Sequence, residues 1–418
     1  MGVKIMNDVF VFDLLHRDGV VTGALGLDLR SGEPIVIRAK AVILATGGYM
    51  GSYPRTMVPM ATGDGTAMAY RAGVEVADME MADFYTYVAV WPPPAKDEEW
   101  PALLVYNLNA TMYNSLGEEY MKRYTGPRRV PPRAAAAEIR AGRCGPHGGV
   151  YISVRHLPVN LVKAYLDSLG RQRFLNVLTS WGFDLINEAL EVVPAAITSF
   201  GGCRINSRCE TNLAGLYAAG EVASGHQGAY VMVGNMVGTS SATGHIAAEQ
   251  AVKYCRENCL AEARPHDVTS RIQEIMKFKE RLAGGCRPVR VRKTVKTILD
   301  RYAHIAGRTD AGLRQGLAEL DDVEKNLLPN MRLGDDNPHF NSEWVQALEA
   351  VNQVQIARLI LISALERTES RGVHHRDDYP EESHDWLKRI VIRRINGRDE
   401  VHHEPLKFTH IGPPERPR

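Results

Sequence analysis

Hydrophobic and polar positions alternate over residues 9–48, the pattern of β-strands that have one buried face. The stretch reads VFVFDLLHRDGVVTGALGLDLRSGEPIVIRAKAVILATGG, and Asp-Gly and Ser-Gly pairs divide it into short runs. We therefore expect a hairpin or meander here. Its last run, AVILATGG, is apolar without alternation, which predicts a strand covered on both faces of an α/β sheet.

Further along the chain the spacing of the hydrophobic residues changes. A helix is expected at DGTAMAYRAGVEV, and from Asp83 to about Ile197 proline- and glycine-rich breakers (WPPP, RRVPPR, GRCGPHGG) indicate an inserted domain. The α/β pattern returns in LAGLYAAGEVA and leads into a helix from about Ser241. Residues 267–370 place apolar side chains at three- and four-residue steps, which is typical of helices, and the last forty-odd residues are polar and strand-like.

Composition and charge exclude some classes of protein. The chain has 418 residues, is 44% hydrophobic, and carries 50 basic against 49 acidic side chains. This balance suggests neither a nucleic-acid partner nor a membrane-surface partner. No apolar run reaches the roughly 20 residues of a membrane span, and no leader peptide is evident, so we expect a cytoplasmic protein without a span.

The six cysteines form no Cys-x-x-Cys pair, and reduced thiols are the simplest interpretation. Cys255 and Cys259 are four residues apart on a predicted helix and would share one face. Two sulfurs without nearby histidines make a poor metal site, so no metal is expected. An iron–sulfur cluster held by this chain is excluded on the same ground.

A dinucleotide-binding domain needs a first β-turn-α unit whose glycines admit the pyrophosphate at a helix N-terminus. No Gly-x-Gly-x-x-Gly occurs in the chain, yet two later parts of such a domain, AVILATGG and GLYAAGEVA, are present in order.

More motifs join these two. TGDGTAMAYRAGVEVADMEM, followed far downstream by RTESRGVHHRDDYP and HDWLKRIVIRR, resembles the flavoprotein subunits of succinate dehydrogenase and fumarate reductase, a family that includes L-aspartate oxidase and adenylylsulfate reductase. The similarity runs nearly end to end. Compared with that family, the first ~150 residues with the glycine motif are lacking. A truncated gene, a split flavoprotein and a degenerate protein that no longer binds FAD all remain open, and truncation is the interpretation that we favour.

The resemblance implies an α/β plus α fold: an incomplete dinucleotide-binding (FAD) domain, an inserted α+β capping domain, a helical domain and a C-terminal segment. The expected boundaries are 1–82 for the partial FAD-binding domain, 83–198 for the capping domain, 199–262 for the return of the FAD-binding domain, 263–370 for the helical domain and 371–418 for the C-terminal segment.

The resemblance also assigns cofactor contacts. Ala45, Thr46 and Gly47 would line the adenine side of FAD, and Asp64 would reach the flavin end. Glu221 would accept hydrogen bonds from cofactor hydroxyls. The backbone around Asn235 and Met236 would donate to the flavin pyrimidine oxygens, because amides at a helix N-terminus stabilise negative charge on a reduced flavin.

The family holds a dicarboxylate with two arginines and two histidines, and this sequence departs at all four positions. Tyr85 and Ile197 stand at the histidines, Tyr106 at the proton-donating arginine and Val231 at the other arginine. We therefore expect an uncharged pocket lined by aromatic and apolar side chains, namely Tyr85, Tyr87, Tyr106, Phe200, Tyr230 and Met232. Each of these residues alone is more often simply part of a hydrophobic core.

The charged run RTESRGVHHRDDYP would be close to the site, with Arg371 and His374 facing the interior and Arg376 and Asp377 in ion pairs. We take Tyr106, Tyr85 and Arg371 as the candidate catalytic residues. The basic run RPVRVRK at 287–293 is expected to be a solvated helix face, and docking of an acidic partner protein is the alternative.

The expected function is hydride transfer to or from flavin N5 with a small-molecule substrate that is not a simple dicarboxylate, and with electrons passed to an iron–sulfur partner or another acceptor. The alternatives are a non-catalytic scaffold subunit of a redox complex and half of a split flavoprotein.

Overall fold

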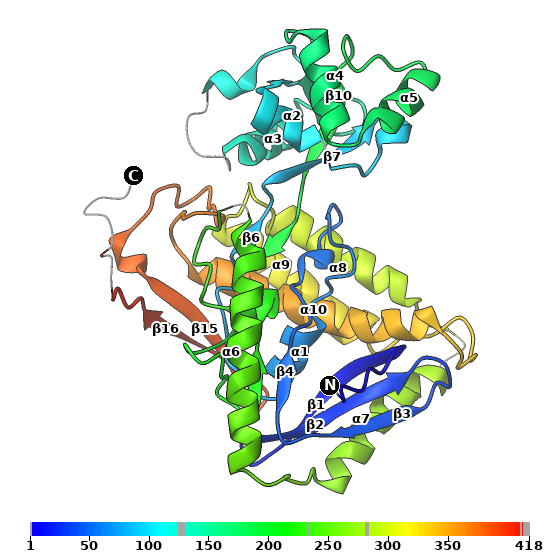
Figure 1. Cartoon of the computed structure of the whole chain (residues 1–418), viewed down its shortest axis with the longest axis vertical. Helices are drawn as coiled ribbons and strands as arrows, with labels where there is room; N and C mark the ends of the chain where they lie inside the picture. The colour runs from blue at the N-terminus through cyan, green and yellow to red at the C-terminus, as the bar shows by residue number, and fades with distance from the viewer. Residues whose placement is uncertain are drawn as a thin grey trace.

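The computed structural model describes residues 2–99, 101–123, 130–232, 234–280, 284–409 and 412. A larger body, built from the first and last parts of the chain, carries a separate capping domain at one end (Figure 1). A two-stranded ribbon of β6 (Ala82–Asp83) and β11 (Thr198–Ser199) joins them. The chain enters the capping domain after β6 and returns through β11.

The N-terminal strands form an antiparallel meander, as the alternating pattern predicted. The sheet has the order β1 (Val9–Arg17), β2 (Val20–Asp28) and β3 (Pro34–Arg38). Asp18 and Gly19 connect β1 and β2 with φ angles of 52° and 82°. Two positive φ angles match the twist of the flanking strands, which explains why an Asp-Gly pair stands there.

The strand predicted from AVILATGG is β4 (Val42–Leu44), and it pairs in parallel with β13 (Leu216–Ala218). The parallel pairing agrees with an α/β body. The expectation that both faces are covered is wrong in the described part of the chain, because Ile43 is 39% exposed. The helix expected after this strand is α1 (Asp64–Arg71).

The capping domain has its own antiparallel sheet and its own hydrophobic core. The sheet order is β7-β10-β9-β8, and helices pack around it. In chain order its elements are β7 (Thr86–Trp91), α2 (Pro101–Leu108), β8 (Thr111–Tyr113), α3 (Val130–Arg140), β9 (Val150–Ser153), α4 (Val159–Ser168), α5 (Gln172–Ser180) and β10 (Leu190–Ala195). The domain boundaries given above stay a prediction.

Residues 263–370 are helical, as their periodicity predicted, in α7 (Pro265–Glu280), α8 (Pro288–Tyr302), α9 (Asp310–Asp322) and α10 (Ser342–Glu366). Asn341 caps α10 by accepting a hydrogen bond from the Trp344 amide. By length and composition α10 could cross a membrane, but 72% of its apolar window is buried inside the protein. It is the central core helix of this domain.

The strand-like C-terminal segment joins a mixed sheet with strands from the rest of the body. Its order is β14 (Ala223–Ser224), β12 (Gly202–Arg204), β5 (Val76–Ala77), β15 (Lys388–Ile395) and β16 (Arg398–Pro405). Pairing of Ile392 with Val76 connects the end of the chain to its first quarter.

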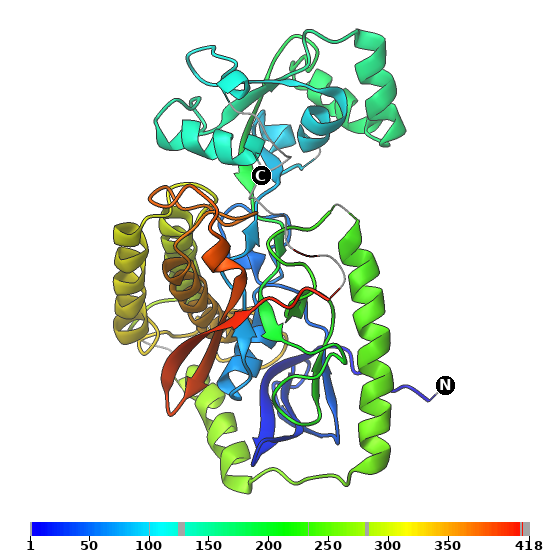
Figure 2. The ribbon, with the colours of Figure 1, turned by 90° about the vertical axis from the view of Figure 1, so that its left-hand side faces the viewer.

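Helix α6 (Asn235–Glu257) runs along one side of the body (Figure 2). It begins earlier than the expected start near Ser241, because Gly234 adopts a φ of 91° ahead of it and the hydroxyls of Thr239 and Ser241 bond carbonyls four residues back. It ends at Glu257, so Cys259 lies beyond the helix. The expectation that Cys255 and Cys259 share one helix face was wrong.

Candidate functional site

The two strand ends singled out in the sequence lie side by side. Leu44 pairs with Ala218, and the Ala219 amide donates to the Leu44 carbonyl at 2.9 Å. Gly47 turns the chain with a φ of 74°. A side chain on Gly48 would meet Glu221 Oε1 at 2.4 Å, so glycine is required where the two strand ends approach each other. Ala45 and Thr46 are exposed beside this turn.

Glu221 connects this corner to the ribbon that carries the capping domain. Its Oε1 accepts hydrogen bonds from the Ser199 amide at 2.9 Å and the Ser199 hydroxyl at 3.1 Å. Burial raises the pKa of Glu221, and the two bonds from Ser199 oppose that rise. Glu221 is thus a largely buried acceptor at the carboxyl end of a parallel strand.

The start of α6 offers uncapped backbone amides. Gly234 precedes the helix without a side-chain cap, and Asn235 and Met236 occupy its first turn. The Asn235 amide donates to the Met232 carbonyl at 3.1 Å, so the positive end of the helix dipole and the amides that follow Asn235 are what favours negative charge here. Positions 238 and 244 are glycines with open space where a side chain would stand, so a flat molecule could approach the helix closely.

Asp64 does not join these groups. Its Oδ2 accepts from the Thr62 hydroxyl at 2.6 Å, and its Oδ1 accepts from Asn352 Nδ2 on α10 at 2.6 Å. The carboxylate therefore binds α1 to the helical domain. The expectation that Asp64 reaches the flavin end stays a prediction, which these contacts do not support.

An apolar cluster fills the junction of the ribbon with the loop before α6. Met81, Phe200 and Val373 are buried there, and Ala229 and Val231 pack against them. The Val373 amide donates to the Ala229 carbonyl at 3.1 Å, which fixes the two loops together.

Of the aromatic residues expected to line a pocket, Tyr85 and Tyr106 do meet. Their ring centroids are 6.0 Å apart, and the Tyr106 hydroxyl donates to the Tyr85 carbonyl at 2.5 Å. Tyr87 is instead fully buried in the core of the capping domain, while Tyr230 and Met232 are 43% and 66% exposed. The predicted set of six does not form one wall. Ile197 is half-buried on the ribbon and donates its amide to the Asp83 carbonyl.

Arg371 is held by carboxylates. Its guanidinium binds both oxygens of Glu369, at 2.8 and 2.9 Å, and Glu382 at 3.2 Å. Its side chain is 21% exposed, so most of it is buried. These ion pairs compensate its charge, and its assignment as a catalytic residue stays a prediction.

The neighbours of Arg371 follow the expectation more closely. His374 is 1% exposed, and its Nδ1 lies 2.7 Å from the Arg308 guanidinium. Burial, followed by the charge of Arg308, lowers the pKa of His374 well below its ordinary value. Arg376 pairs with Asp378, whereas the carboxylate of Asp377 lies 3.5 Å from His375.

Sequence reasoning missed Ser199 and His226. Ser199 is recognisable only in the structure, through its two bonds to Glu221. His226 lies in the glycine-framed segment GHQGAY directly after β14, a few residues beyond Glu221, and this position is the signal that could have found it. Its Nδ1 is buried without a hydrogen-bond partner, and burial, then the charge of Arg389, lowers its pKa.

An α/β body whose parallel strand ends meet a helix N-terminus beside a capping domain defines a class of nucleotide-cofactor proteins. Comparison with known proteins specifies it further. Residues 1–237 match the FAD binding domain family, and residues 292–418 match the fumarate reductase flavoprotein C-terminal family. The chain therefore belongs to the FAD-dependent oxidoreductases of the fumarate reductase and succinate dehydrogenase flavoprotein family.

Two relatives are each 34% identical over 94% of this chain. One is an uncharacterized FAD-dependent oxidoreductase of Methanocaldococcus jannaschii, of which 70% is covered. The other belongs to the fumarate reductase (CoM/CoB) of Methanothermobacter marburgensis, and 71% of that subunit is covered. The expectation that an N-terminal segment with the glycine motif is lacking stays a prediction.

Among solved structures, Sdh1 of Mycobacterium smegmatis in complex with UQ1 has a TM-score of 0.86 and 28% identity, covering 96% of this chain and 67% of that one. The quinol fumarate reductase of E. coli has a TM-score of 0.82 at 24% identity over 97% of this chain and 72% of that one, and so shares the fold. The predicted α/β plus α fold class is confirmed.

The described residues fit FAD at its flavin and ribose ends. The partly buried Glu221 carboxylate suits sugar hydroxyls, and the turn has open space at Gly47. The uncapped first turn of α6 suits the electron-rich pyrimidine edge. These residues could therefore supply contacts to FAD, the cofactor of this family.

Proposed function

We propose that the protein transfers a hydride between flavin N5 and a small neutral or aromatic substrate rather than a simple dicarboxylate. One observation carries the proposal: the ribbon and the loop before α6 meet in the apolar cluster of Met81, Phe200, Val231 and Val373. A dianion placed there would lose hydration without gaining a charged partner.

The nearby arginines support this choice of substrate, because their charges are already compensated. Arg371 binds Glu369 and Glu382, and Arg389 binds Asp78 at 2.8 Å. Recognition of two carboxylates relies on bidentate, charge-assisted donors. Freeing either arginine for that purpose would leave a carboxylate unpaired.

Bound FAD would supply a hydride acceptor or donor at N5. The chain itself would position the substrate between the ribbon and the loop of residues 228–232, with Tyr85 and Tyr106 at the side of the capping domain. Tyr106 donates its proton to a backbone carbonyl and would have to break that bond to act as an acid. His226 is the better candidate to move a proton, because its imidazole is neutral and its Nδ1 is unbonded.

The test uses the FAD-loaded protein with two dicarboxylate assays, reduced viologen with fumarate and phenazine dye with succinate. We expect no turnover on either while the flavin remains intact. Turnover near 10 per second, a typical enzyme rate, would overturn the proposal and favour the activity named for the Methanothermobacter relative.

A matched pair of variants sharpens this test. Val231→Arg places a guanidinium in the apolar cluster, whereas Val252→Arg places one at an exposed position of α6 far from its first turn. Fumarate should perturb the flavin absorption band of the first variant at lower concentration than that of the wild type. The second variant should match the wild type. Equal behaviour of both variants would mean that Val231 does not face the substrate.

For electron transfer we propose an iron–sulfur partner subunit or another acceptor, since relatives are named as subunits of larger enzymes. The basic run 287–293 gives little support for an acidic partner, because Arg287 pairs with Glu343 and Arg292 with Glu349. We place the protein in the cytoplasm. A scaffold without flavin is the less supported alternative, and the absence of a flavin absorption band from the purified protein would favour it.

A further inference from the structure

A pocket of about 390 Å³ lies in the capping domain between α4 and α5, at the end remote from the ribbon (Figure 1). It shares no lining residue with the candidate flavin site. Its walls come from the facing sides of the two helices and from the loop 183–187 that follows α5.

The floor of the pocket is aliphatic. Val162, Leu166 and Leu178 line it and are at most 1% exposed. The opening also has an apolar edge, since Val159 is 45% exposed. The pocket can therefore remove the hydrocarbon part of a small molecule from water.

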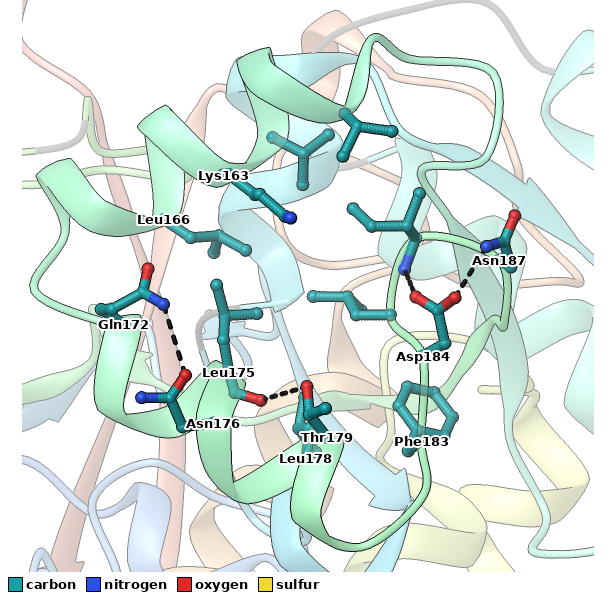
Figure 3. A pocket seen from close by; sticks show the side chains of 14 residues that line it. Lys163, Leu166, Gln172, Leu175, Asn176, Leu178, Thr179, Phe183, Asp184 and Asn187 are labelled. Carbon is teal, nitrogen blue, oxygen red and sulfur yellow. Dashed lines mark hydrogen bonds between the residues drawn. The ribbon is translucent and has the colours of Figure 1, made fainter.

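A positive charge stands over this floor. Figure 3 shows the Lys163 side chain directed from α4 into the pocket, with its amino group facing the space between the helices. Among the described residues, no hydrogen bond or ion pair to Lys163 is found. Its ammonium attracts Asp184 across the pocket, but it can receive an anionic group without breaking a hydrogen bond or a direct ion pair.

The opposite side carries a negative charge that is held in place. Asp184 accepts hydrogen bonds from Asn187 Nδ2 at 2.7 Å and from the Ile186 amide at 3.0 Å (Figure 3). The bond from Asn187, and then the bond from Ile186, lower the pKa of Asp184, so it is ionised at neutral pH. A ligand with a second carboxylate at that end would be repelled.

We propose that this pocket binds a small amphipathic monocarboxylate, with its carboxylate on Lys163 and its hydrocarbon part on the aliphatic floor. Lys163 would bind the carboxylate, and the aliphatic floor would cover the hydrocarbon part. Asp184 would repel the second carboxylate of a dicarboxylate of the same length. The site needs no bound cofactor, so its test is independent of the redox function.

The experiment titrates the full chain with octanoate below its micelle concentration, followed by calorimetry and by saturation-transfer NMR of the ligand. Octanoate should bind, and suberate, the dicarboxylate of the same length, should bind at least about tenfold more weakly. Lys163→Gln should weaken octanoate binding by about tenfold or more, because a charge-assisted contact is lost. Lys96→Gln, at an exposed lysine of the same domain, should leave binding unchanged.

A second variant tests the opposite side. Asp184→Asn should narrow the preference for octanoate over suberate, while thermal melting checks that the capping domain stays folded. Undetectable octanoate binding at millimolar concentration, or equal affinity in the wild type and Lys163→Gln, would overturn the proposal. Binding of octylamine as tight as that of octanoate would do the same.

Discussion

At the scale of single residues, the charged segment after α10 is defined by burial. Arg367 is 2% exposed, lies 2.7 Å from Glu80 and 2.9 Å from Glu369, and both carboxylates are fully buried. Arg367 is thus the arginine partner of Glu80 and shares Glu369 with Arg371. Such a network contributes to stability only while every member is present.

Arg367→Met should therefore lower the free energy of unfolding by about 3–5 kcal/mol, because it leaves the buried Glu80 carboxylate without an arginine partner, whereas Glu369 keeps its pairing with Arg371. Arg30→Met is the control: Arg30 pairs with Asp8 at the surface and is 63% exposed, so the loss should stay under about 1 kcal/mol. Urea denaturation measures both variants. Equal losses would show that the Glu80 network is not a buried charge cluster.

Glu221 should make the stability of the folded protein depend on pH. Burial raises the pKa of Glu221 in the folded protein. The protonated side chain therefore contributes fully to stability below the pKa that Glu221 has in the unfolded chain. This contribution is lost as pH rises through the pKa that Glu221 has in the folded protein. Glu221→Gln cannot ionise and should melt at a higher temperature than the wild type at pH 8. The difference should shrink toward pH 5. Glu257→Gln, at an exposed position of α6, should show no such trend.

The contacts of these residues mark what the sequence could and could not predict. Glycines and a glutamate at the strand ends were visible because a close approach of two backbones requires small residues and a fixed φ. Which carboxylate binds which guanidinium depends on distances between segments far apart in the chain. The partners of Arg371 and Asp64 could not be predicted for that reason.

At the scale of elements, α6 is attached by a narrow stripe. Its buried residues are Thr243, Ala247 and Ala251, spaced four apart, while much of the rest of its surface is exposed. A helix held along one line can be displaced by one change on that line.

Ala247→Glu and Ala248→Glu provide a matched pair on α6. The first places a carboxylate in the buried stripe and should lower the free energy of unfolding by more than about 2 kcal/mol, and the second, at an exposed alanine, should change it by less than about 0.5 kcal/mol. Thermal denaturation followed by circular dichroism checks both. If the two variants melt alike, α6 is not packed as described.

A contact between two helices also attaches the capping domain to the rest of the protein. Arg140, the last residue of α3, donates to the carbonyls of Asp300 at 3.3 Å and Arg301 at 2.7 Å, in the final turn of α8. Cations satisfy free carbonyls at helix C-termini. The contact joins the capping domain to the helical domain beside the ribbon.

Arg140→Ala should speed amide hydrogen exchange in α3 and at the ribbon without changing exchange in the core of α10. Arg171→Ala, which removes an ion pair with Glu98 inside the capping domain, is the control and should leave the ribbon unaffected. Unchanged exchange at the ribbon in Arg140→Ala would show that this contact does not hold the two parts together.

At the scale of the whole molecule, one side of the body is apolar at its surface. Val237 and Val252 on α6 are 74% and 50% exposed, and Ile43 on β4 is 39% exposed. With a net charge of +1 and a pI near 7.7, the chain has little charge repulsion at neutral pH. Exposed apolar surface on a nearly uncharged protein favours association.

The protein alone should therefore associate at micromolar concentration near pH 7.7. Replacing Val237 and Val252 by lysine should shift it toward the monomer, whereas lysine at Val289, an exposed residue on α8, should not. Light scattering coupled to gel filtration measures the mass. A monomeric wild type under these conditions would contradict the expectation.

Periodicity predicted the N-terminal meander and the helical region, because helices and strands differ in their hydrophobic repeat, whereas the arrangement of domains was expected from the family resemblance. The ribbon at residues 82–83 and 198–199 was anticipated only as a change of pattern near Asp83 and Ile197. The expectation that Ile43 is buried was wrong. An apolar run in the sequence does not reveal which neighbouring elements are present to bury the strand.

The parallel pair of β4 and β13 also sets an order of events during synthesis. β4 leaves the ribosome with the residues around Leu44, but its partner strand, Leu216–Ala218, follows only after the whole capping segment. At translation rates of roughly 5–20 residues per second, β4 waits on the order of 10 to 35 seconds for its partner. The capping domain, whose sheet pairs strands within one contiguous segment, can fold during that interval. The flavin corner at Gly48 and Glu221 can therefore form only after the capping domain has been synthesised, although before the helical domain is complete.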